Sequence, residues 1–92
     1  MAIGFVLINT APHREAPVFQ SLQDVPEVVD LQPLFGDYDL IAKVEVEDFA
    51  ALGAVVSRAI RAIPGVTEAQ ALSGTNHDEP RTGTGFPAFV RA

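Results

Sequence analysis

Hydrophobic and polar positions change their period in an orderly way along this chain, beginning at the N-terminus. Residues 2–8 are apolar at both alternating sets of positions, with Ile3, Phe5 and Leu7 in one set. A strand with this pattern is buried on both faces. We therefore expect residues 2–8 to form a central strand of a sheet.

A helical spacing follows the first strand and opens near residues 12–13. Its apolar positions recur at intervals of three and four residues: Val18, Phe19, Leu22 and Val25. Pro17 fits within the first helical turn, where the amide hydrogen has no helical partner. Pro26 then ends the predicted helix.

Two strand-like runs come next, residues 28–35 and 38–47, joined at a corner by Gly36 and Asp37. Such a two-residue connection is a hairpin signal. The first run contains Pro33, which cannot donate to a ladder and belongs at a sheet edge. The second run alternates, and its inward positions are apolar: Leu40, Ala42, Val44 and Val46.

A second helix is predicted after Asp48, which is a good N-cap residue. Its apolar stripe again has helical spacing: Phe49, Leu52, Val55, Val56, Ala59, Ile60 and Ile63. Pro64 and Gly65 stop this helix, and residues 66–73 read as the last strand. The second helix therefore returns the chain to the sheet.

The predicted order is βαββαβ, which is the ferredoxin-like α+β sandwich with an antiparallel sheet. In this topology the first and third strands are central, and the second and fourth lie at the edges. The chain agrees, because its doubly apolar run comes first and its proline-bearing run second. We assign residues 1–75 to this domain and residues 76–92 to a C-terminal tail.

Composition narrows the functional classes. The 92 residues carry a net charge of −6 and no cysteine. An acidic surface disfavours direct nucleic-acid binding, and the absence of cysteine removes disulfides and thiol catalysis. No signal peptide or membrane span is evident, so we expect a soluble, cytoplasmic protein. We also expect no catalytic arrangement, metal site or cofactor; His77, Asp78 and Glu79 are adjacent and do not converge on one ion.

The corner gathers an exposed glycine, two carboxylates and a phenol within four residues, Gly36 to Asp39. This mixture suits a small polar ligand better than a core. The FGDYD corner, followed by an amphipathic helix and the IPGV segment at residues 63–66, resembles the effector-binding domain of the Lrp/AsnC, or feast/famine, regulators. The resemblance covers residues 2–75.

The resemblance implies an amino-acid effector and a binding site for it: Phe35, Gly36, Asp37, Tyr38, Asp39, Gln70 and Ser73. Asp39 would pair with the α-ammonium group, and backbone N–H groups near Gly36 would hold the α-carboxylate. Related domains often offer threonine hydroxyls from the last strand, where this chain has Ala69 and Ala71. The alternative is that Gly36 merely supplies a positive φ, and that Asp37 and Asp39 are solvated turn residues.

The sheet face away from the helices is also apolar, through the first strand and Ile41. A bare apolar face is unusual on a monomer, so we expect a homodimer that packs sheet against sheet. The resemblance further implies rings of dimers and, as a further partner, full-length Lrp/AsnC regulators. Because the chain begins at the first strand, we expect it not to bind DNA by itself.

Three functional classes remain open. The first is a stand-alone effector-binding and oligomerisation module without catalytic activity. The second is an enzyme of the small dimeric α+β barrel monooxygenase type, for which Asn9 is one of few polar pocket candidates. The third is an assembly module that binds no ligand. The location of a cavity, inside one subunit or between dimers, would discriminate among them.

Overall fold

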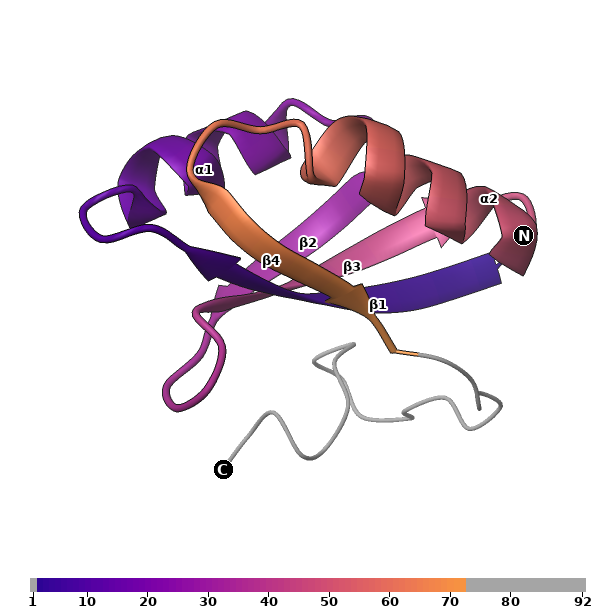
Figure 1. Cartoon of the computed structure of the whole chain (residues 1–92). Coiled ribbons are helices and arrows are strands. Elements are labelled where there is room, and N and C mark those ends of the chain that lie inside the picture. The colour runs from indigo at the N-terminus through magenta and orange to yellow at the C-terminus, as the bar shows by residue number, and fades with distance from the viewer. Residues whose placement is uncertain (1, 73–92) are drawn as a thin grey trace.

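Two helices cover one face of a four-stranded antiparallel sheet in the computed structural model, which describes residues 2–72 (Figure 1). The elements follow in this order: β1 (Ala2–Thr10), α1 (Glu15–Gln23), β2 (Val28–Pro33), β3 (Leu40–Val46), α2 (Phe49–Val55), a π-helical turn η1 (Val56–Ile60) and β4 (Val66–Ala71). The strands lie side by side as β2-β3-β1-β4. The predicted ferredoxin-like fold, with the first and third strands central, is confirmed.

The core lies between the sheet and the helices. Its buried side chains come from alternate positions of the two central strands and from both helices: Val6, Ile8, Leu40, Val44, Val18, Leu22, Leu52 and Ile60. Gly4 lets α2 approach β1 closely, since a Cβ added at Gly4 would lie 2.5 Å from Cδ2 of Leu52. A side chain at position 4 would therefore require Leu52 to move.

Local signals in the sequence place both helices. Pro17 is the third residue of α1 and so lies in its first turn, as predicted. Oδ1 of Asp48 accepts the backbone N–H of Ala51 at 2.9 Å, which confirms the predicted N-cap. Phe49 was expected in the buried stripe, but this side chain is 55% exposed. It occupies the first position of α2, at the rim of the core.

The end of the second helix is wider than an α-helix. The N–H of Arg61 donates to the carbonyl of Val56 at 2.9 Å and closes the π-helical turn. Leu52, Val56 and Ile60 are buried at every fourth position. Because a fourth residue lies about 40° past a full α-helical turn, the wider turn keeps these side chains over the sheet.

The connection between β2 and β3 differs from the predicted two-residue corner. β2 ends at Pro33 and β3 begins at Leu40, so the loop comprises residues 34–39. The N–H of Leu34 donates to the carbonyl of Asp39 at 2.9 Å and closes this loop. The prediction was wrong because the N–H of Asp39 turns to β1 instead, where it donates to the carbonyl of Ile8 at 3.0 Å.

Both edge strands carry groups that cover backbone atoms. In β2, Pro33 has no N–H, and Oδ1 of Asp30 accepts the N–H of Leu31 at 2.9 Å beside a β-bulge. In β4, Nη2 of Arg61 donates to the carbonyl of Ala69 at 2.9 Å. Covered edges of this kind oppose strand addition from another chain.

The sheet face away from the helices, which we call the open face, is partly apolar. Ile3, Phe5 and Leu7 alternate with the core residues of β1, and Ile3 is 43% exposed. Ile41 of β3 lies opposite Leu7 and is fully buried. Apolar side chains therefore line this face as predicted, but the face is not bare at Ile41, which is fully buried. The predicted tail, residues 76–92, lies outside the described residues.

Candidate functional site

The loop between β2 and β3 projects beyond the end of the sheet (Figure 1). Gly36 has a φ of 109°, and no heavy atom lies within 4 Å of the place where its Cβ would be. Phe35 is fully exposed and Asp37 is exposed. The expectation that Gly36 supplies a positive φ is confirmed, and the loop presents its backbone to the surroundings.

Asp39 ties this loop to the end of β1. Its Oδ2 accepts the backbone N–H of Thr10 at 2.8 Å and the Thr10 hydroxyl at 3.1 Å. Its own N–H donates to the carbonyl of Ile8 and also lies 3.1 Å from Oδ1 of Asn9. Asp39 is therefore not a solvated turn residue, as one interpretation of the sequence had it. One of its carboxylate oxygens is already committed to the fold.

Asn9 has a structural partner as well. Because its side chain receives the N–H of Asp39, it anchors the start of β3 to the end of β1. Asn9 was one of the few polar candidates named for the enzyme interpretation, and here its Oδ1 accepts a backbone N–H.

Tyr38 brings the loop into contact with β4. The Tyr38 hydroxyl lies 2.9 Å from Oε1 of Gln70 and 3.5 Å from Oε2 of Glu68. Because β1 lies between β3 and β4, the phenol reaches across β1 on the open face. Two of the predicted site residues, Tyr38 and Gln70, are thus in direct contact although they are distant in the sequence.

Sequence reasoning missed Glu68. In β4, Glu68 pairs with Asn9 and Gln70 with Leu7, so both side chains lie on the open face. The alternation of a strand was a signal for this residue, because position 68 must share a face with position 70. Ala69 lies on the helix side, where it is buried in the core. Ala69, one of the two positions matched to the threonines of related domains, therefore faces away from Tyr38.

The pKa of Tyr38 is raised above its ordinary value of 10.0. Partial desolvation of the phenol contributes most, and the negative charge of Glu68 follows, with its hydrogen bond and a smaller effect of Asp37. Each of these disfavours the phenolate. The phenol therefore remains protonated, and able to donate, throughout the neutral range.

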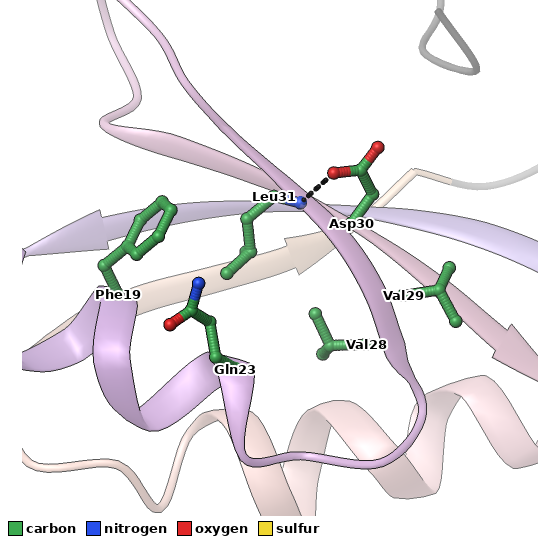
Figure 2. A pocket seen from close by; sticks show the side chains of 6 residues that line it. All are labelled: Phe19, Gln23, Val28, Val29, Asp30 and Leu31. Carbon is green, nitrogen blue, oxygen red and sulfur yellow. Dashed lines mark hydrogen bonds between the residues drawn. The ribbon is translucent and has the colours of Figure 1, made fainter.

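A groove lies apart from this loop, between α1 and the outer edge of β2 (Figure 2). It has a volume of about 280 Å³ and is lined by side chains of both elements: Phe19, Gln23, Val28, Val29, Asp30 and Leu31. None of these belongs to the predicted site. Within residues 2–72, no three His, Cys, Asp or Glu side chains gather where a metal ion would bind. Ser73 lies outside the described residues.

The family model for the Lrp/AsnC ligand-binding domain matches residues 3–73. The chain is similar to the solved structure FFRP-DM1, at 32% identity and a TM-score of 0.73, over 78% of this chain and 96% of that one. The protein TTHA0845 from Thermus thermophilus is 30% identical, with a TM-score of 0.77, over 88% of this chain and 100% of that one.

A transcriptional regulator from Neisseria meningitidis, solved in complex with L-Met, has the same fold at 23% identity and a TM-score of 0.74. That match covers 92% of this chain and 55% of the regulator. Among curated proteins, no match was found. The family model spans nearly the whole described region, including the loop and β4. The chain therefore belongs to the Lrp/AsnC family, through the ligand-binding domain of those regulators.

Proposed function

We propose that this chain is an amino-acid-binding and oligomerisation module that acts in regulation and has no catalytic activity. The effector binds where the loop of residues 34–39 meets β4. The observation that carries the proposal is the hydrogen bond between Tyr38 and Gln70, since it joins the loop to β4 in one polar site. Ser73 is proposed to complete this site.

The loop suits an α-carboxylate. Within the described part of the chain, the N–H groups of Gly36, Asp37 and Tyr38 donate to no other residue. Successive free N–H groups in a glycine-containing turn bind anions. The Oδ2 of Asp39 is held by Thr10, and this bond fixes the loop in place. These three N–H groups are therefore proposed as the hydrogen-bond donors to an effector's α-carboxylate.

Two comparisons support this assignment. The Neisseria meningitidis regulator was solved with L-Met, so a protein of this fold holds an amino acid. FFRP-DM1 and TTHA0845 are matched over nearly their whole length, which supports the proposal that the domain functions without a DNA-binding half. The net charge of −6 opposes binding to duplex DNA. We expect no gel shift with the purified protein at physiological salt.

The open face supports oligomerisation. Ile3, Phe5 and Leu7 form an apolar strip beside the buried Ile41. A second copy related by a two-fold axis would cover this strip. We propose a homodimer formed through the open face, gathered further into a ring of dimers. Full-length Lrp/AsnC regulators are proposed as partners for mixed assembly.

A thermal-shift screen against the twenty amino acids, read together with the mass by light scattering, tests the proposal. A true effector at about a hundredfold excess over its Kd should stabilise the protein by roughly 2.7 kcal/mol. Gln70→Ala should abolish the shift. Gln32→Ala is a matched control, since Gln32 lies on the open face of the opposite edge strand. If no amino acid shifts the wild type, the sensor proposal is wrong and an assembly module without ligand replaces it.

A further inference from the structure

We infer that the effector carries a cationic side chain, so that the ligand is a basic amino acid selected by Glu68. This inference rests on the proposed function and names the ligand class of the same site. It follows from which groups around Tyr38 are already paired and which are not.

Glu68 keeps most of its capacity to accept hydrogen bonds. The Tyr38 hydroxyl has one proton and two acceptors, Oε1 of Gln70 at 2.9 Å and Oε2 of Glu68 at 3.5 Å. One hydroxyl donates a single proton, and the shorter contact is the stronger bond. Gln70 therefore takes the phenol proton, and the exposed Glu68 carboxylate is left with a weak partner.

No cation among the described residues neutralises this site. Asp37 and Glu68 form no ion pair within residues 2–72. Lys43 lies opposite Phe5, on the far side of β1 from β4. The guanidinium of Arg61 donates to the carbonyl of Ala69, whose side chain lies on the helix side. Within residues 2–72 Glu68 therefore has no cationic partner, and the side chain of a basic ligand would supply one.

The geometry also separates the two ends of the ligand. The free N–H groups of Gly36 to Tyr38 are in the loop, and Glu68 is on β4. An amino acid with its α-carboxylate in the loop would extend its side chain along Tyr38 toward Glu68. Charge-assisted hydrogen bonds to a carboxylate are about twice as strong as neutral ones. The face of an aromatic ring attracts the same cation.

A neutral side chain in this position would cover the Glu68 carboxylate without pairing it, which costs free energy. The site thus disfavours ligands with neutral side chains in addition to favouring ligands with cationic ones. Lysine and norleucine form a matched ligand pair, because they differ only in the ε-ammonium group. We expect lysine or arginine to bind roughly tenfold or more tightly than norleucine, and this preference should fall as salt is added.

Titration calorimetry with lysine, arginine, norleucine and glutamate tests the inference on the full chain. Glu68→Gln should remove the preference for lysine over norleucine. Glu45→Gln is the matched control, since Glu45 lies on the open face of β3 on the other side of β1, and it should retain that preference. Cadaverine, which has the cationic chain but no carboxylate, should bind much more weakly than lysine.

The outcomes separate the two proposals. If norleucine or another neutral amino acid binds as tightly as lysine, or if Glu68→Gln keeps the preference, the cationic class is wrong while the sensor proposal stands. If cadaverine binds as tightly as lysine, the cationic class stands and the amino-acid assignment is wrong. If neither lysine nor arginine binds, or if only glutamate binds, the cationic class is wrong, and the screen of the twenty amino acids decides the sensor proposal.

Discussion

Thr10 and Asp39 are joined by two hydrogen bonds to one oxygen. The backbone N–H of Thr10 lies 2.8 Å, and its hydroxyl 3.1 Å, from Oδ2 of Asp39. The pair links the last residue of β1 to the residue just before β3. It thereby sets the base of the loop that carries Gly36 and Tyr38.

Asp39→Ala should lower the free energy of unfolding by about 1–3 kcal/mol, because the half-buried N–H of Thr10 loses its acceptor. Urea denaturation measures this loss. Asp37→Ala is the matched control in the same loop, and its exposed carboxylate should contribute less than about 0.5 kcal/mol. Equal stabilities of the two variants would show that the Thr10 bond contributes nothing.

The titration of Tyr38 can be followed directly, since it is the only tyrosine and the chain has no tryptophan. Its raised pKa means that the folded state favours the protonated phenol. The protonated phenol of Tyr38 therefore stabilises the folded state fully below the ordinary pKa of 10.0. This stabilisation is lost as pH rises through the pKa that Tyr38 has in the folded state. Phenolate absorbance should therefore develop above pH 10.0 in the native protein and at a lower pH in urea. Glu68→Gln should lower the native midpoint; an unchanged midpoint would remove Glu68 as a cause.

Alanine substitutions of Gly4 and Gly53 form a matched pair that tests how closely α2 packs on β1. Gly4→Ala would place a methyl group 2.5 Å from Cδ2 of Leu52, and such overpacking costs about 1–3 kcal/mol. Gly53→Ala meets no atom within 4 Å in α2, and alanine is favoured over glycine in a helix by about 1 kcal/mol. Thermal denaturation should show opposite shifts. A stabilising Gly4→Ala would mean that α2 does not lie close to β1.

The proposed dimer is tested by Ile3→Asp. Ile3 is 43% exposed on the open face, so the charge should cost little in the folded monomer and much in a sheet-to-sheet interface. Light scattering across the micromolar range should show dissociation. Val29→Asp is the control, because Val29 is similarly exposed at the edge of β2. Dissociation by Val29→Asp alone would place the interface at that edge instead.

Local rules accounted for most of the fold. Alternation in β1 and β3, the proline in β2 and the cap at Asp48 each act within a few residues, and the structure follows them. The corner was the exception. Gly36 and Asp37 look like a two-residue hairpin turn, but Asp39 bonds to Ile8 and Thr10, which are about thirty residues earlier. Such a long-range partner leaves no periodic signal in the sequence.

The candidate site was also predictable only in part, because some of its contacts join residues that are distant in the sequence. The resemblance supplied Tyr38 and Gln70, and the structure shows them in contact. It also assigned Asp39 to the ligand, whereas Thr10 holds one of its oxygens. Strand alternation places Glu68 on the same face as Gln70. The contact of Tyr38 with that face joins residues thirty positions apart, and such a long-range contact leaves no periodic signal in the sequence.

Backbone amide shifts measured by NMR during titration with lysine report where the ligand binds. If lysine binds between the loop and β4, the largest changes fall on residues 34–39 and on β4, and Val28 to Leu31 beside the α1–β2 groove remain unchanged. Saturable changes centred on that groove, with the loop unaffected, would contradict this binding site.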